Sequence, residues 1–167
     1  NSVTPDDMYA AYGADTLRLY AMSMGPIDQD RPWETRSVGG SQRLLQRVWR
    51  NIVDEATGEL LLCDEAPSSE LNRALHRTID GVRADMDGLR FNTAIAKMTE
   101  LNNEVTKVDG PTPRIVADAM IRMLSPLVPH MAEELWHKLG GDGSVVWASF
   151  PEADPALLVD DQIELPV

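Results

Sequence analysis

Four arginines share one face of a predicted helix in the first third of the chain. Arg36, Arg43, Arg47 and Arg50 follow one another at spacings of seven, four and three residues. These spacings return to the same side of an α-helix at about 100° per residue. Each guanidinium presents a planar fork of donors that fits two phosphate oxygens at once. The pattern therefore predicts a row of cationic groups able to bind a phosphate backbone.

The charge around this row contrasts with that of the rest of the chain. Residues 31–50 contain five arginines and a single acidic residue, Glu34, so the segment has a net charge of +4. Since the whole chain of 167 residues carries −12, the remainder carries −16. The overall charge argues against unselective nucleic-acid binding, but at physiological salt exposed charges act only over about 8 Å. The concentrated positive charge indicates a local site, with a solvated helix face as the alternative.

An amphipathic helix is needed to present the row, and the sequence predicts one over residues 33–56. The side opposite the arginines is apolar and comprises Val38, Leu45, Val48, Trp49, Ile52 and Ala56. Gly39 and Gly40 weaken the start of this helix, because each costs about 1 kcal/mol relative to Ala. One face of the helix is expected to pack in a core while the other shows the arginines to solvent.

The rest of the chain also has the periodicity of helices. Helices are predicted over residues 4–12, 15–24, 69–87, 92–105, 112–124 and 130–139, between Gly, Pro and Asp turns. Asp15 is expected to cap the second helix. Polar residues expected on solvated faces are Asp80, Asp85, Asp87, Asn102 and Asn103. With a short extended piece around residues 145–147, the pattern predicts an all-α antiparallel helical bundle with a short extended C-terminal tail.

Composition argues against several other kinds of site. The one cysteine, Cys63, excludes an intramolecular disulfide and a zinc site built from several cysteines. His130, Glu134 and His137 share a helix face at a spacing that could hold zinc, but no further ligand stands out. No nucleophile has a matching base, and no apolar run approaches the roughly 20 residues that span a bilayer. We therefore assign no catalytic residue, no metal site and no membrane segment.

Four strings of the sequence resemble one enzyme family. YGADTLRLY (12–20) and SPLVPHMAEELW (125–136) resemble the two ends of the helical bundle that follows the catalytic domain in class I aminoacyl-tRNA synthetases for branched aliphatic amino acids. GGSQRLLQRVWR (39–50) and RFNTAIAKMTELNNEV (90–105) resemble leucyl-tRNA synthetases more than the valyl or isoleucyl enzymes. The opening NSVTPDD is similar to the continuation of that family's KMSKS loop. The resemblance implies a fragment covering the helical anticodon-binding domain after the KMSKS loop.

The resemblance implies a domain order and a role. Residues 1–30 would connect to the catalytic domain, 31–141 would form the anticodon-binding bundle, and 142–167 would lead towards a missing C-terminal domain. The parent enzyme would use ATP and Mg²⁺ to join leucine to tRNA(Leu), as a cytoplasmic monomer with catalytic, editing and C-terminal domains. The signature strings HIGH and KMSKS are absent here, so this chain would need no cofactor of its own and would be inactive alone.

The same resemblance implies which helix faces tRNA. In the family the basic helix of this bundle does so, and the matching positions are Arg43 and Arg47 in QRLLQRVW; Arg50 and Arg36 extend the row. Contacts with phosphate and ribose would orient the tRNA and read no sequence, since A-form RNA hides base edges in a deep groove. The alternatives are a helical protein-interaction module with an acidic surface, or the equivalent domain of a valyl- or isoleucyl-tRNA synthetase.

Overall fold

The chain folds as a bundle of helices, as predicted. The computed structural model describes residues 3–159 and contains seven α-helices in that range. The helices are α1 (Pro5–Tyr12), α2 (Ala14–Ser23), α3 (Val38–Arg50), α4 (Ser69–Asp87), α5 (Phe91–Thr106), α6 (Arg114–Leu124) and α7 (Pro129–Lys138). The short elements are the 3₁₀ turns η1 (Thr35–Ser37), η2 (Val145–Trp147) and η3 (Pro155–Leu157), and the strands β1 (Leu62–Cys63) and β2 (Thr112–Pro113). The predicted all-α class is confirmed.

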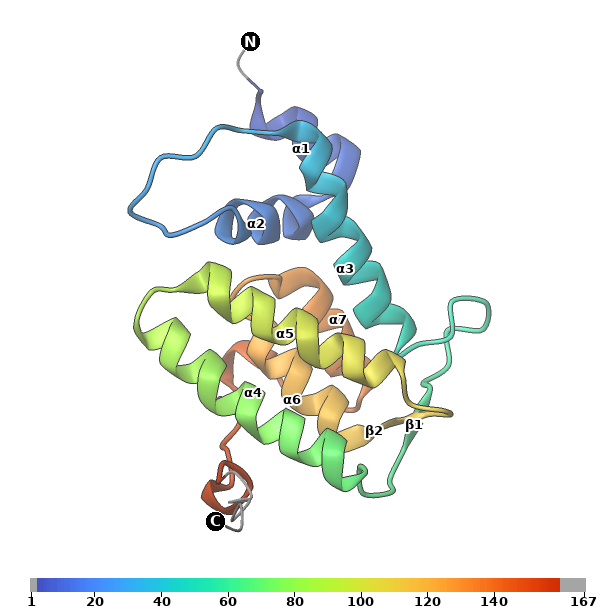
Figure 1. The fold of residues 1–167 in the computed structure, drawn as a ribbon. Helices are drawn as coiled ribbons and strands as arrows, with labels where there is room; N and C mark the ends of the chain where they lie inside the picture. The colour runs from blue at the N-terminus through green and yellow to red at the C-terminus, as the bar shows by residue number, and fades with distance from the viewer. Residues whose placement is uncertain (1–2, 160–167) are drawn as a thin grey trace, which may run out of the picture.

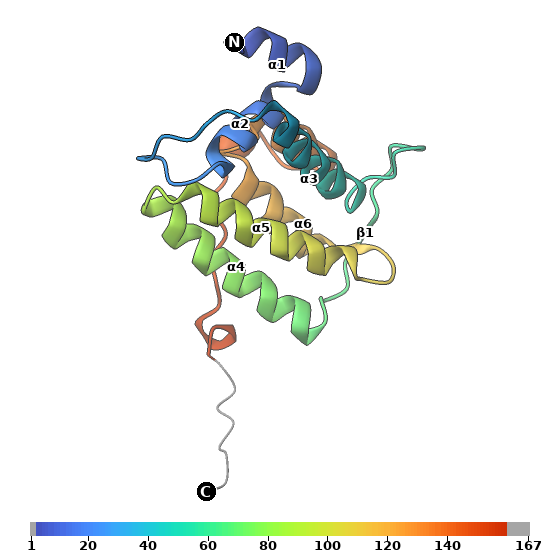
Figure 2. The ribbon, with the colours of Figure 1, turned by 45° about the horizontal axis from the view of Figure 1, so that its top comes forward.

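The helices pack around one main core. Figure 1 shows α4 and α5 side by side as an antiparallel pair, with α6 and α7 behind them and α1, α2 and α3 above. The centre of the core is almost fully buried and includes Leu19, Leu75, Met98, Leu101, Ile121, Met123, Leu124 and Leu135. Burying one such side chain contributes about 1.5–3 kcal/mol. This packing fixes α3 along one side of the molecule, which Figure 2 shows from a second direction.

α4 has the predicted bounds but departs from the prediction at one carboxylate. Ser68 caps the helix by accepting a hydrogen bond from the Leu71 backbone N–H at 3.2 Å. Asp85 was expected to be solvated, yet it is only 4% exposed and forms ion pairs with Arg90 and Lys97. The other two aspartates of the expected acidic face are exposed. Asp85 lies three residues after the buried Val82, on the edge of the apolar stripe, and therefore turns towards α5.

Asp15 caps a different helix from the one predicted. α2 begins after Gly13, which has φ 83° and provides no side-chain cap. The Asp15 carboxylate instead accepts hydrogen bonds from the backbone N–H groups of His130 at 3.3 Å and Met131 at 2.7 Å, and lies 2.8 Å from His130 Nδ1. Val128, the residue before α7, offers no side-chain cap. Asp15 therefore satisfies donors of α7 that would otherwise lack a partner.

Replacing this carboxylate should loosen the contact between α2 and α7. We expect Asp15→Ala to lower the free energy of unfolding by about 1–2 kcal/mol, the usual cost of a lost helix cap. Urea denaturation followed by circular dichroism measures this difference. Asp28→Ala, in the exposed loop after α2, is the matched control and should change stability by less than about 0.5 kcal/mol. Equal effects of the two substitutions would contradict a capping role.

Other predicted segments are corrected or lie outside the described range. Thr112 and Pro113 form strand β2, parallel to β1, instead of the first turn of a helix. Residues 145–147, expected to be extended, form the 3₁₀ turn η2, because the Ser144 side chain caps that turn by accepting from the Val146 N–H. The predicted extended tail, 142–167, also contains the 3₁₀ turn η3, which the Asp154 side chain caps by accepting from the Ala156 N–H. Residues 160–167 of that tail lie outside the described residues. The proposed divisions at residues 30/31 and 141/142 stay predictions. None of the described helices is long and apolar enough to cross a membrane.

Candidate nucleic-acid interface

The arginine helix is amphipathic, as the sequence predicts, but shorter. α3 buries Leu44, Leu45 and Val48 in the main core and Val38 in a smaller cluster with Met8 and Tyr20. Arg43, Arg47 and Arg50 on its other side are exposed. The helix ends at Arg50, so Ile52 is buried in the following turn and Ala56 is exposed. Two of the arginines occupy the last turn, where positive charge complements the helix dipole. Three guanidiniums are thus presented on one rigid element.

Arg36 belongs to a different local structure from the other three arginines. It lies in the 3₁₀ turn η1, before α3 begins at Val38, so the predicted helix starting at Trp33 is wrong at its first turn. The Glu34 side chain accepts from the Arg36 backbone N–H at 3.2 Å. Trp33 packs edge-on against Tyr20 at 4.9 Å between ring centroids, and the Tyr20 hydroxyl donates to the Glu34 carbonyl. This anchoring on α2 keeps residues 33–34 extended and places Arg36 on a turn.

The two arginines in the last turn of α3 have partners within the protein. Arg47 Nη1 donates to the Asn103 side-chain oxygen of α5 at 3.1 Å. Arg50 Nε donates to the Gln46 carbonyl at 3.2 Å and lies 3.7 Å from a carboxylate oxygen of Glu55. Both members of that ion pair are more than half exposed, so it contributes at most about 1 kcal/mol and could yield to a phosphate.

Arg43 is the arginine of α3 whose guanidinium has no partner among the described residues. Within residues 3–159, the side chains of Arg43 and Arg36 have no hydrogen bond or ion pair. The Arg43 guanidinium lies beside the two glycines of the first turn: a Cβ added to Gly39 would be 3.4 Å from Nη1, and one added to Gly40 would be 3.9 Å from Nη2. A side chain at either glycine would thus touch this guanidinium at an ordinary contact distance without displacing it.

The sequence analysis did not predict the polar contacts between α3 and α5. Asn103 is exposed as predicted, but Asn102 is only 2% exposed, and the prediction that it is solvated is wrong. Asn102 follows Ile95 by seven residues and Met98 by four, which places it on the buried stripe of α5. The spacing therefore contained the signal. Its side-chain oxygen accepts a hydrogen bond from Asn51 Nδ2 at 2.9 Å, directly after the end of α3.

The two histidines that share a face of α7 make contacts within the protein. His130 pairs with Asp15, and His137 Nε2 lies 3.7 Å from a carboxylate oxygen of Glu133. Glu134 lies at 4.0 Å from Lys138. No group of three or more His, Cys, Asp or Glu side chains within residues 3–159 is placed to hold a metal ion.

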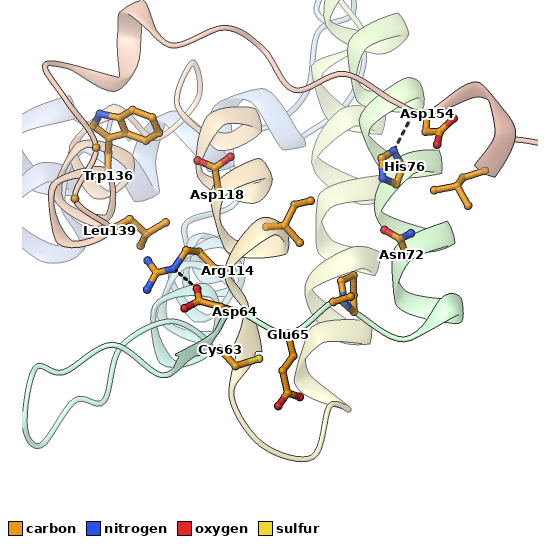
Figure 3. A pocket seen from close by; sticks show the side chains of 16 residues that line it. Cys63, Asp64, Glu65, Asn72, His76, Arg114, Asp118, Trp136, Leu139 and Asp154 are labelled. Carbon is orange, nitrogen blue, oxygen red and sulfur yellow. Dashed lines mark hydrogen bonds and ion pairs between the residues drawn. The ribbon is translucent and has the colours of Figure 1, made fainter.

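An open groove of about 740 Å³ lies away from the arginine helix, between β1, α4, α6 and α7 (Figure 3). Two pairs of its polar groups contact each other. Arg114 Nε lies 2.9 Å from a carboxylate oxygen of Asp64, and His76 Nδ1 accepts from the Asp154 backbone N–H at 2.8 Å. Its cysteine, Cys63, donates to a backbone carbonyl. Because the histidine has no nucleophile beside it, the groove does not resemble an active site.

Comparison with known proteins identifies the family. The family model described as the anticodon-binding domain of tRNA ligase matches residues 69–166, which is more than half of the chain. Leucine--tRNA ligase of Streptomyces avermitilis is 61% identical over 163 residues, covering 98% of this chain and 17% of the relative. Leucine--tRNA ligase of Saccharopolyspora erythraea is 59% identical over 169 residues, covering 100% of this chain and 18% of the relative. The chain thus spans less than a fifth of the length of these relatives.

A solved structure has the same fold. In the crystal structure of the ternary complex of Agrobacterium radiobacter K84 agnB2 LeuRS-tRNA-LeuAMS, the matching part of the synthetase has a TM-score of 0.76 and 24% identity. The match covers 94% of this chain and 22% of that one. The family match begins at α4, whereas the two relatives and this fold extend over nearly all of the chain, α3 included. The resemblance noted from the sequence is confirmed: this chain belongs to the family of anticodon-binding domains of tRNA ligases.

Proposed function

We propose that this chain is the tRNA-docking domain of a leucine–tRNA ligase. In this proposal it holds tRNA(Leu) through phosphate and ribose contacts of Arg43, Arg47 and Arg50, with Arg36 at the edge. The observation that carries the proposal is the exposed arginine face of α3, fixed by the buried opposite face of the same helix. The family match and the leucine–tRNA ligase relatives favour it over a protein-interaction module and over a valyl or isoleucyl domain.

The chemistry assigned to this domain is binding and orientation. The Arg43 guanidinium has no partner among residues 3–159. The Arg47 guanidinium is already hydrogen-bonded to Asn103 of α5, and Arg50 would exchange its exposed partner Glu55 for a phosphate. Such contacts set the position of the RNA without reading its bases. Activation of leucine with ATP and Mg²⁺, and its transfer to tRNA, would be the work of other domains of a cytoplasmic, monomeric parent, so the isolated domain would not aminoacylate.

The salt dependence of tRNA binding tests this proposal. If three or four phosphates are neutralised, the logarithm of the binding constant should fall with the logarithm of salt concentration with a slope of about −2 to −4. Titration of labelled tRNA(Leu) with the parent ligase at several salt concentrations measures the slope. Arg43→Ala should make the slope shallower by about one. Arg114→Ala, which removes an exposed guanidinium from α6, should leave the slope unchanged. A slope unaffected by Arg43→Ala contradicts the proposed face.

A further inference from the structure

Two adjacent asparagines of α5 form hydrogen bonds with side chains at the end of α3. Asn103 is exposed and accepts from Arg47 Nη1 at 3.1 Å, while the buried Asn102 accepts from Asn51 Nδ2 at 2.9 Å. Arg47 and Asn51 are four residues apart and so lie one above the other along α3. Figure 1 shows that the last turn of α3 approaches the C-terminal half of α5. The row of arginines is therefore attached to a second helix at this end.

The buried half of this contact sets the register between the two helices. Asn51 Nδ2 also lies 3.0 Å from Thr106 Oγ1, and Thr112 Oγ1 donates to the Asn51 carbonyl at 2.6 Å. Thr106 Oγ1 in turn donates to the Asn102 carbonyl at 2.8 Å. Asn102 is buried, whereas Asn51 is half-buried and Thr106 is exposed, and Asn102 Nδ2 is buried without a partner among the described residues. The bond from Asn51 to the Asn102 side-chain oxygen is therefore the costly one to lose, because its loss would leave a second polar atom of Asn102 unsatisfied. It fixes where the Asn103 side chain lies relative to α3.

The exposed hydrogen bond from Arg47 to Asn103 involves a guanidinium that we assign to RNA binding. A guanidinium has five N–H donors, and Asn103 engages one nitrogen of Arg47, so the exposed side chain keeps donors for a phosphate. An exposed arginine loses considerable rotamer freedom when it is fixed by a ligand. The amide oxygen of Asn103 can orient the Arg47 guanidinium before RNA binds, and it leaves the positive charge of the guanidinium intact. A carboxylate at the same place would repel the phosphate. Arg43 has no such partner among the described residues.

We infer that Asn103 is a positioning residue of the tRNA interface, which orients the Arg47 guanidinium towards a phosphate of the RNA backbone. This inference rests on the proposed function. In this arrangement α5 is the second element of the interface, although the Asn103 amide acts on the RNA only through Arg47. Loss of Asn103 should therefore matter only while Arg47 is present, which separates positioning from a direct contact with RNA.

A double-mutant cycle in the full-length parent ligase tests the inference. The measured quantity is the affinity for tRNA(Leu). It is compared with and without Asn103→Ala in three backgrounds: the wild type, Arg47→Ala and Arg43→Ala. We expect Asn103→Ala to weaken binding about threefold in the wild type and in Arg43→Ala, and to have no effect in Arg47→Ala. The urea midpoint of Asn103→Ala should equal that of the wild type, since the lost hydrogen bond is exposed.

Other results of this experiment would separate failure of the positioning role from failure of the proposed function. An equal loss in all three backgrounds would mean that Asn103 contacts RNA itself or supports the fold, and would overturn the positioning role. If Arg47→Ala weakens binding while Asn103→Ala does not, the positioning role fails and the proposed function stands. If neither Arg43→Ala nor Arg47→Ala weakens binding, the proposed function fails and the inference falls with it.

Discussion

Replacing Arg43 and Arg47 together by alanine should lower leucine transfer to tRNA by the parent ligase at least tenfold. Both guanidiniums are exposed on α3, one turn apart, and each is assigned a charge-assisted hydrogen bond to phosphate. Such a bond contributes about 1.5–3 kcal/mol, and less where water competes. Because 1.4 kcal/mol corresponds to a factor of ten in affinity, two weakened bonds suffice for the expected loss. The measurement is the transfer rate at tRNA concentrations below saturation.

A second reaction of the same enzyme distinguishes weak docking from general damage. In the proposed parent ligase, leucine-dependent ATP–pyrophosphate exchange would not require transfer to tRNA, so the double variant should exchange at the normal rate. Raising the tRNA concentration should restore much of the transfer rate, because the lost interaction is binding. Arg114→Ala, which removes a guanidinium from α6, should leave both reactions unchanged. Normal transfer by the double variant would show the row to be a solvated surface, although membership of the family would stand.

Patterns within one helix were sufficient to predict several helices and the exposure of two arginines of α3. The spacing of apolar residues, with Gly88 as a stop signal, placed α4 at its observed bounds. The same reasoning placed Arg43 and Arg47 on one exposed face of α3. Local signals are reliable here because helix periodicity and capping act within a few residues.

Contacts between distant residues set the limit of prediction. Asp15 caps α7 because the fold brings it to His130, 115 residues away, and no local pattern indicates that partner. Arg36 leaves the row because Trp33 packs on Tyr20 of another helix. The missed burial of Asn102 is different in kind, because its position on the apolar stripe of α5 was visible in the spacing.

The buried carboxylate of Asp85 should be among the most sensitive positions for stability. Asp85→Asn keeps the size of the side chain but leaves Arg90 and Lys97 without their anion. Breaking a buried ion pair from one side costs about 3–5 kcal/mol. The two cationic side chains are 54% and 39% exposed and can return to water, so we expect a loss of about 2–3 kcal/mol at pH 7. Urea denaturation measures it, with the exposed Asp87→Asn as the matched control.

The pH dependence of this loss identifies its electrostatic origin. Burial raises the pKa of Asp85, but hydrogen bonds from Lys97, Thr93 and Arg90 outweigh that effect and hold the pKa below its usual range. A carboxyl with a lowered pKa in the folded state stabilises the fold above its unfolded pKa of about 3.9, and this contribution is lost as pH falls through the folded value. The difference between wild type and Asp85→Asn should therefore be constant from pH 7 to 5 and shrink below pH 4. A difference that stayed undiminished in acid would show that Asp85 stabilises the helix pair by packing, not by its charge.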